Sequence, residues 1–416
     1  MSIAPGPLPQ LREFSTDSDA NNEYYKFILV FTRHGGDVKV GYMTVDPKKT
    51  TTILPKLNYV TWPKLRNLTD FTPVVLKNQL YILGGKEKKA NGRRKKEVLK
   101  FDPTSNKWAD SAPLRRKRWN FAACTFDGKI YIAGGEIPQG TCATDASETY
   151  EPFINEWLDE DPIPKIRRNH CLLPWRDKVV LVGGSTGKHF KPRQTNSIWV
   201  LEKKWPSGFQ ADPKYVWSEL ESQETLLPLV QDNLLCTIHR DVLYIFRDPT
   251  KVNFLPKVPS QSNPSDASLL EQRSKRPRLE DTSESLSHKQ ISPDTLTPGD
   301  QCTERLKSGK FSQTTRRAKD LHLSCECISL QQPRTGAGVI TLGHRIYLIG
   351  GHRPDNPDHC VLDVEYYHTK SRKWFKAFSL GDRSLTDVKC CVLKVPVSNT
   401  DFKGQSGALY YRWPLW

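Results

Sequence analysis

Pairs of short apolar runs, each split by a polar turn, recur along the chain. The stretch FAACTFDGKIYIAGG at residues 121–135 shows the pattern, with Asp127-Gly128 between two apolar runs and a Gly-Gly pair at the end. GVITLGHRIYLIGG at residues 338–351 repeats it. Two apolar runs around a Gly-containing turn are typical of an antiparallel β-hairpin. The pattern therefore predicts an all-β chain built from many short hairpins.

The Gly-Gly pairs recur at a nearly constant spacing. The first four follow one another at 49, 50 and 49 residues, in the series Gly35-Gly36, Gly84-Gly85, Gly134-Gly135, Gly183-Gly184 and Gly350-Gly351. Aromatic residues recur with them, as Tyr81, Tyr131 and Tyr347 three residues before a pair, and as Trp108, Trp157 and Trp374 downstream. A period near 50 residues marks a repeat architecture. Each unit predicts four strands, with the glycines after the second and the Trp on the fourth.

This unit resembles the kelch repeat. The likeness rests on the Gly-Gly pair, the Tyr before it, and the turns FDPTSNKW, YEPFINEW and YHTKSRKW that end in Trp. The resemblance implies a β-propeller of four-stranded blades around a central channel. We expect six blades, because NLLCTIHRDVLYIFRD at residues 233–248 has both apolar runs, although Arg247-Asp248 stands where the glycines should be.

The two ends of the chain predict how the ring closes. Residues 1–22 are polar and proline-bearing, so the first unit has no obvious first strand upstream. DVKCCVLKVP at residues 387–396 offers that strand, which is the usual closure in the kelch family and removes exposed sheet edges. We expect a flexible N-terminal segment over 1–22, a six-bladed propeller over 23–400 and a C-terminal tail over 401–416.

A long insertion separates the fifth unit from the sixth. Residues 255–318 are rich in Ser, Pro, Asp and Glu and poor in aromatic residues, a composition typical of disorder. We therefore expect a disordered loop in blade five. Within it, Lys275, Arg276 and Arg278 resemble a nuclear import signal, and the alternative is a solvated basic cluster.

Charge and cysteine usage limit the class of protein. The formal net charge of +16 permits anionic partners but identifies none. The N-terminus lacks the apolar core of a secretory signal, and no run of 18 apolar residues occurs, so we expect no membrane span. The ten Cys lie in apolar strand-like runs without CxxC spacing. We expect reduced thiols in a cytoplasmic or nuclear protein.

Arginines recur at one position ahead of several units. Arg118, Arg167 and Arg334 each lie 16 residues before the first Gly of their pair. Arg383 lies just before the closing strand, and Arg66 lies near the equivalent place in the second unit. In BTB–kelch proteins Arg residues at this position can line the partner pocket, so the resemblance implies one mouth suited to carboxylates or phosphates. The alternative is that each Arg fixes its own turn through backbone carbonyls.

The loops after the Gly-Gly pairs are basic. Seven of the eleven residues over 86–96 are Lys or Arg. The candidate partner-binding residues in these loops are Lys86, Arg93, Arg94, Lys188, Arg193, His352 and Arg353. We expect them to form a positive face that steers an acidic partner. The alternative is a set of solvated loop tips.

The repeats look most like the kelch half of BTB–kelch proteins, whose BTB and BACK domains bind a cullin while the propeller selects substrates for ubiquitination. Because residues 1–22 leave no room for those domains, we do not expect this chain to bind a cullin in that way. We predict a monomeric protein-interaction module that captures an acidic protein motif, as a subunit or fragment of a cullin-type ubiquitin ligase acting through an adaptor. The alternative is a nuclear or cytoskeletal scaffold.

Two other classes have less support. Metal-dependent catalysis needs clustered ligands, and the best local group is His352, Asp355, Asp358 and His359 in the loop HRPDNPDHC. Nucleic-acid binding fits the charge, but aromatic residues are not interleaved with the basic runs. We therefore predict no catalytic residue, no metal, no cofactor and no nucleic-acid partner.

Overall fold

The computed structural model describes most of the repeat region. The described residues are 24–34, 37–60, 62, 65, 67–87, 93, 95–138, 143–186, 193–195, 197–204, 214–220, 234–248, 323–381, 385–403 and 408–411. The chain divides into two units, residues 1–253 with 322–416, and residues 254–321. All described residues belong to the first unit. The predicted insertion and its basic cluster Lys275, Arg276 and Arg278 lie outside them.

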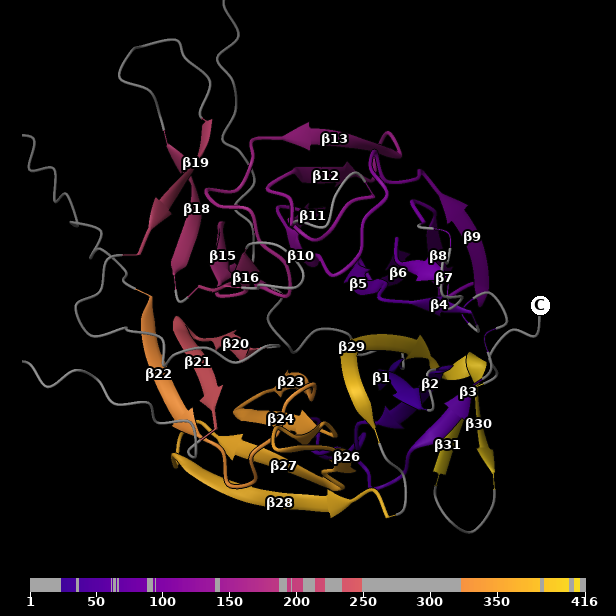
Figure 1. Cartoon of the computed structure of the whole chain (residues 1–416). Helices are drawn as coiled ribbons and strands as arrows, with labels where there is room; N and C mark the ends of the chain where they lie inside the picture. Colours follow the sequence, from indigo (N-terminus) through magenta and orange to yellow (C-terminus); the bar gives the residue numbers. More distant parts are fainter. Residues whose placement is uncertain are drawn as a thin grey trace, which may run out of the picture. The chain divides into compact units, whose positions relative to one another are not determined.

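Six sheets stand in a ring, and we number them as blades one to six (Figure 1). Blade one is β29 (Thr386–Pro396), β1 (Tyr24–His34), β2 (Asp37–Thr44) and β3 (Asn58–Val60). Blade two is β5 (Thr72–Leu76), β6 (Gln79–Leu83), β8 (Val98–Asp102) and β9 (Lys107–Ser111). Blade three is β10 (Ala122–Phe126), β11 (Lys129–Ala133), β12 (Ser147–Glu151) and β13 (Glu156–Glu160).

The other half of the ring follows the same order. Blade four is β14 (Cys171–Trp175), β15 (Lys178–Val182), β18 (Ile198–Lys204) and β19 (Lys214–Glu219). Blade five is β20 (Leu235–His239), β21 (Val242–Arg247) and β22 (Ser324–Ser329). Blade six is β23 (Gly338–Leu342), β24 (Arg345–Ile349), β27 (Asp363–His368) and β28 (Lys373–Ser379). The predicted all-β, six-bladed propeller is therefore confirmed.

Short two-stranded sheets lie outside the blades. They are β4 (Leu68–Thr69) with β7 (Lys86–Glu87), β16 (Ser185–Thr186) with β17 (Arg193–Gln194), β25 (His352–Arg353) with β26 (Asn356–Cys360), and β30 (Thr400–Lys403) with β31 (Ala408–Tyr411). The 3-10 turn η3 (Val397–Asn399) precedes the last pair. The segment expected as a tail thus contains a hairpin. No helix among the described residues has the length and apolar character that crossing a membrane requires.

The two ends of the repeat region meet in blade one. Strand β29 pairs antiparallel with β1 from Tyr24↔Pro396 to Phe31↔Lys389, with one irregularity near Arg33. The innermost strand of this blade therefore comes from the C-terminal end of the chain, as predicted. Hydrogen bonds across this seam join the two ends of the repeat region and close the ring.

Blade five departs from the repeat. Strand β22 runs parallel to β21, with Val242↔Ser324 and Arg247↔Ser329 in register, whereas every other pairing within a blade is antiparallel. In blade two the residue after the fourth strand, Leu114, donates its N–H to Lys96 O ahead of the third strand at 2.7 Å. In blade five Leu330 donates instead to Arg247 O, on the second strand, at 2.9 Å. Strand β22 is therefore a fourth strand paired directly with the second.

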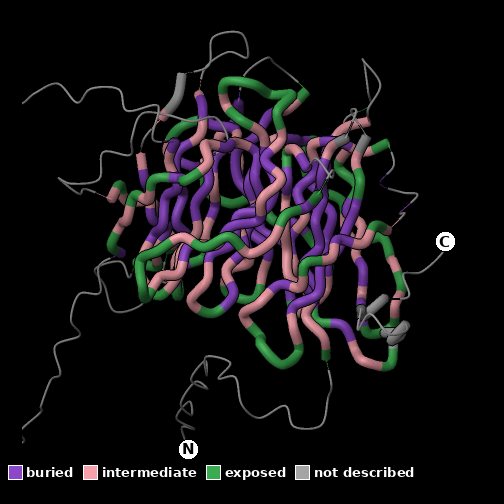
Figure 2. The backbone as a smooth tube through the Cα atoms, turned by 90° about the horizontal axis from the view of Figure 1, so that it is seen from below, coloured by how far each residue is buried: buried purple, intermediate pink, exposed green. Residues whose placement is uncertain are grey.

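Apolar clusters fill the space between neighbouring blades. One cluster joins Val74, Tyr81 and Leu83 of blade two to Phe121 and Trp157 on the side of blade three. The indole Nε1 of Trp157 donates to Ala112 O, just beyond blade two, at 2.9 Å, and Trp374 makes the equivalent bond to Ser329 O at 3.1 Å. Figure 2 shows the resulting buried backbone through the interior of the ring, with exposed positions at its turns.

The Gly-Gly pairs allow neighbouring blades to approach at backbone distance. Gly134 and Gly135 have φ of 62° and 88°, where L side chains are strained. A Cβ on Gly135 would lie 2.6 Å from Trp119 O. The Gly135 N–H donates to Arg167 O, at the start of blade four, at 2.9 Å. Gly85 bonds to Arg118 O in the same way at 3.1 Å. The second Gly of a pair thus links its blade to the next.

We predict that Gly135→Ala destabilises the propeller much more than Gly128→Ala. Both glycines have positive φ, but a Cβ on Gly128 meets nothing within 4 Å. Strain alone costs about 1 kcal/mol for Gly128→Ala. Gly135→Ala adds a backbone clash and should lose about 3 kcal/mol or more. Urea unfolding of the two variants measures the difference, and equal losses would contradict the role given to the pair.

Candidate functional site

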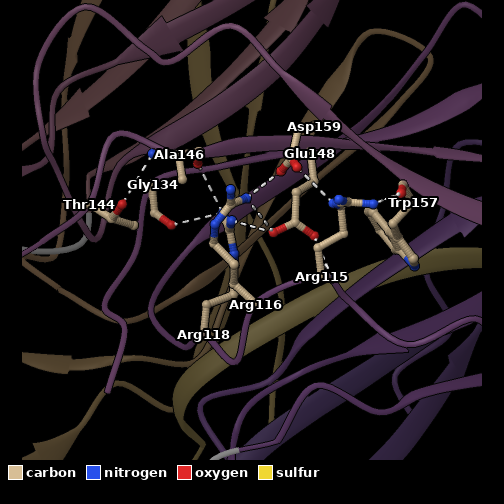
Figure 3. Close-up of polar contacts among 9 residues, drawn as sticks. All are labelled: Arg115, Arg116, Arg118, Gly134, Thr144, Ala146, Glu148, Trp157 and Asp159. Atoms are coloured by element: carbon tan, nitrogen blue, oxygen red, sulfur yellow. Dashed lines mark hydrogen bonds and ion pairs between the residues drawn. The ribbon is translucent and has the colours of Figure 1, made fainter. Parts of the chain in front are cut away.

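The recurring arginines are buried inside the blades. The Arg118 side chain is fully buried, and its Nη1 donates to Gly134 O at 3.2 Å and to Ala146 O at 3.0 Å (Figure 3). Its Nη2 lies 2.6 Å from Oε1 of Glu148, which is also fully buried. Burial lowers the pKa of Arg118, and the Glu148 charge opposes that effect. The guanidinium therefore holds the first Gly of its own blade.

Arg334 and Arg167 occupy the same place in blades six and four. Arg334 pairs with Glu365 and donates to Gly350 O at 3.5 Å. Arg167 donates to Gly183 O at 3.0 Å, but it meets the hydroxyl of Ser197 at 3.4 Å where the other two meet a carboxylate. Burial lowers the pKa of Arg167 to about 10.

These positions correct the predicted arginine mouth. The side chains of Arg118, Arg167 and Arg334 have no exposed surface and are bonded to their own blades. They agree with the alternative that each Arg fixes its turn, because the guanidinium points into the blade rather than into solvent. Arg66 and Arg383 lie outside the described residues.

We predict that Arg118→Met destabilises the fold far more than Arg115→Met. Arg118→Met removes the nearest cation from the buried Glu148 carboxylate, which keeps the Arg115 N–H at 2.9 Å and Arg116 Nη1 at 3.5 Å. The loss should be about 3 kcal/mol, the lower end for a broken buried pair. Arg115 is 50% exposed and pairs with Asp159 at 2.7 Å. An exposed pair contributes about 0–1 kcal/mol. Chemical unfolding compares the two variants, and similar small losses would show that Arg118 is not the support described.

A cavity of about 530 Å³ lies on the axis of the ring. It opens where first strands begin and second strands end. One residue from each blade contributes to its wall: Val388, Phe71, Phe121, His170, Leu235 and Ala337. Three of them, Phe121, His170 and Ala337, follow the recurring arginines by three residues. That spacing is a signal in the sequence that identifies channel-lining positions, although the arginines themselves are buried.

Five charged residues lie on this cavity, and we call them the charged mouth: Arg33, Asp70, Lys86, Asp387 and Lys389. Arg33 pairs with Asp70, and its Nη1 lies 3.4 Å from Oδ2 of Asp387. Lys86 Nζ lies 2.8 Å from the other carboxylate oxygen of Asp70. Lys389 Nζ donates to Phe71 O at 2.5 Å. Three cations therefore face two carboxylates.

Lys389 is the most perturbed cation of the charged mouth. Burial lowers its pKa to about 8, while Asp70 raises it and Arg33 lowers it further. The sequence prediction included Lys86 but missed Arg33 and Lys389. Both missed residues lie at the seam where β1 meets β29, and their proximity to β7 depends on ring closure.

His170 lies on the same cavity without a polar partner. It is 6% exposed, and neither ring nitrogen has a hydrogen bond to the described residues. Burial lowers its pKa to about 3, and the charges of Arg167 and Arg118 lower it as well. His170 is therefore neutral at physiological pH and adds no charge to the cavity.

We predict that His170 makes the fold sensitive to acid. Its pKa is near 6.5 in the unfolded chain and about 3 in the fold, so below pH 6.5 only the unfolded state takes up a proton. The free energy of unfolding should fall by about 1.4 kcal/mol per pH unit below pH 6.5. His170→Leu should reduce that slope in urea titrations between pH 7.5 and 5.5. Parallel losses in both proteins would contradict this assignment.

The other predicted loop residues are only partly described. Lys86 belongs to the charged mouth, and Arg93 is exposed with its carbonyl accepting the Glu87 N–H at 3.1 Å. Arg94 and Lys188 lie outside the described residues, and Arg193 is described only as part of β17. His352 and Arg353 form β25.

The loop HRPDNPDHC folds as the β25–β26 pair. Arg353 Nη2 lies 2.8 Å from Oδ2 of Asp355 and lowers the pKa of that carboxyl group. Asp358 and His359 stand on the exposed β26. Within the described part of the chain, no three His, Cys, Asp or Glu side chains are arranged to hold a metal ion.

Two segments of the chain are similar in sequence to a known repeat motif and to proteins that contain it. A model of the Kelch motif matches residues 68–115 and 333–377, which cover blade two and most of blade six. Human Kelch-like protein 33 is 32% identical over 73 residues, which is 18% of this chain and 13% of that protein. Human Kelch-like protein 6 is 36% identical over 66 residues, 16% of this chain and 10% of that protein.

A plant relative shows the same repeat. An F-box/kelch-repeat protein of Arabidopsis thaliana is 32% identical over 78 residues, or 18% of this chain and 20% of that protein. The aligned segments of these three relatives therefore span between 10% and 20% of the relatives' own length. The likeness concerns the repeat itself.

Proposed function

We propose that this six-bladed β-propeller, which carries Kelch motifs, is a protein-interaction module that captures an acidic segment of a partner protein at the charged mouth. The observation that carries this proposal is the excess of cations on the axial cavity. A carboxylate of the partner can pair with Lys86 or Lys389 while Asp70 keeps its bond to Arg33.

The position of the charged mouth favours a partner that approaches along the axis. The side chains of Arg33 and Lys86 are 34% and 32% exposed, so both can meet a partner while remaining anchored to Asp70. Exposed Arg93 follows in the loop after β7. The net charge of +16 accelerates the encounter with an acidic partner. Apolar wall residues such as Phe71 and Phe121 offer area for a neighbouring side chain.

We further propose that this module selects substrates for a cullin-type ubiquitin ligase through a separate adaptor. This step is supported by likeness to Kelch-like proteins and to a "Kelch repeat and BTB domain-containing protein" of Danio rerio, 31% identical over 68 residues. Co-purification of a cullin and an adaptor with the tagged chain tests it. Recovery of acidic partners without any ligase component would favour a scaffold.

We predict that Lys86→Gln/Arg93→Gln weakens binding of a labelled hexaglutamate peptide. Loss of two favourable charge contacts should lower the affinity about tenfold or more, and added salt should reduce the difference. The matched control is Lys49→Gln/Lys107→Gln, which removes the same charge from two exposed positions, a turn after β2 and the first residue of β9, at the opposite ends of the strands. Fluorescence anisotropy measures the affinity of each protein.

The control decides between a site and a bulk charge effect. Equal weakening in both variants would show that net charge alone attracts the peptide. Saturable, salt-dependent binding of single-stranded oligonucleotides by a protein that does not bind hexaglutamate would favour the nucleic-acid alternative.

A further inference from the structure

A second cavity, of about 350 Å³, lies between blades three and four. Its wall combines three aromatic rings with three carboxylates: Phe126, Tyr131, Tyr215, Asp127, Glu160 and Asp161. None of these residues lines the axial cavity. The second cavity is therefore separate from the charged mouth, and its chemistry is the opposite one.

The cavity exists because this seam is closed differently from its neighbour. Between blades two and three, Asn155 Oδ1 accepts the Ala112 N–H at 3.1 Å, and Trp157 donates to Ala112 O. Strands β18 and β19 of blade four are longer than β12 and β13 of blade three. Tyr215 stands two residues before Trp217, so it takes the place that Asn155 has before Trp157 in blade three. Among the described residues, the Tyr215 hydroxyl donates to Asp127 Oδ2, at 3.4 Å. The seam is left open around the ring of Tyr215.

The carboxylates on the wall of this cavity outnumber its lysines. Among the described residues, Asp127, Glu160 and Asp161 form no ion pair within 4.0 Å. Two lysines, Lys129 and Lys214, also line the cavity. Lys129 Nζ pairs with Glu151 Oε2 at 2.9 Å, so three carboxylates face one lysine, Lys214, that has no ion pair among the described residues. The pKa of Tyr215 is raised first by burial and next by the charge of Asp127. A local negative field thus persists on a chain whose net charge is +16.

Aromatic rings beside carboxylates suit a cation that is planar and weakly hydrated. Phe126 and Tyr215 meet edge to face, with their centroids 5.6 Å apart, and form one wall. The ring of Tyr215 already accepts a cation, since Lys203 Nζ lies 6.0 Å from its centroid. A guanidinium can stack on such a ring and donate two parallel hydrogen bonds to one carboxylate, which an ammonium cannot do.

We propose that this cavity binds the guanidinium of an arginine side chain carried by a partner protein. Glu160 and Asp161 would accept its hydrogen bonds, and Tyr215 and Phe126 would contact its face. The proposal does not depend on the charged mouth. Acidic or phosphorylated side chains are repelled from this cavity by the same three carboxylates.

The test uses the full chain and a short blocked peptide, acetyl-Gly-Arg-Gly amide, with a citrulline peptide as its uncharged isostere. Nuclear magnetic resonance titration should show saturable binding of the arginine peptide and at least tenfold weaker binding of the citrulline peptide. Glu160→Gln/Asp161→Asn should weaken the arginine peptide about tenfold. Glu156→Gln, an exposed carboxylate on the same strand β13 that does not line the cavity, should leave the affinity unchanged.

Several outcomes would overturn the proposal. They are the absence of saturable binding by the arginine peptide, equal affinity for the citrulline peptide, and equal weakening by Glu156→Gln. The same titration is repeated with free arginine in place of the peptide. If free arginine binds as tightly as the peptide, the proposal that the guanidinium belongs to a partner protein is wrong. The Lys86→Gln/Arg93→Gln variant should bind the arginine peptide normally, so failure at the charged mouth and failure here are distinguishable.

Discussion

The propeller depends on one repeated interaction, between a buried guanidinium and a Gly-Gly pair. The side chain of Arg118 holds the carbonyl of Gly134 in its own blade, while its backbone carbonyl accepts the N–H of Gly85 from the preceding blade. Arg118, and likewise Arg167 with Gly183 and Gly135, therefore fixes a blade internally and attaches it to its neighbour, whereas Arg334 holds Gly350 within its own blade. Because both glycines have positive φ and no Cβ, no other residue pair lets the two backbones approach this closely.

Blades four and five lack part of the Arg and Gly-Gly arrangement and still keep their place in the ring. Blade four keeps Arg167 but offers it the hydroxyl of Ser197 in place of a carboxylate. Blade five has Arg247-Asp248 in place of the glycines and pairs its fourth strand directly with its second. It still fills its side of the ring, because the inner strands β20 and β21 supply the apolar side chains that contact blades four and six. Burial of those strands outweighs the missing repeat elements.

The two proposed binding surfaces are formed largely by residues outside the repeated Gly-Gly, Arg and Trp positions. The charged mouth is formed by residues at the ring closure and after the glycines of blade two. The acidic cavity lies at a seam where the outer strands β18 and β19 are longer than those of blade three. The two surfaces carry opposite charge although they belong to one strongly basic chain. The net charge therefore affects the rate at which the chain encounters a partner. The charged and aromatic side chains of each surface decide which chemical group that surface can bind.

The sequence by itself determined the repeat, the number of blades, the strand that closes the ring and the role of the Gly-Gly pairs that the structure describes. Those features depend on local turns and on spacings that recur along the chain. Tertiary structure decided which side of each blade a side chain faces. Arg118, Arg167 and Arg334 were candidates for an open mouth, yet they are fully buried, while Arg33 and Lys389 reach the cavity. The reason is physical: a one-residue change of register turns a side chain from solvent to core, and only ring closure brings residues 33, 70 and 389 together.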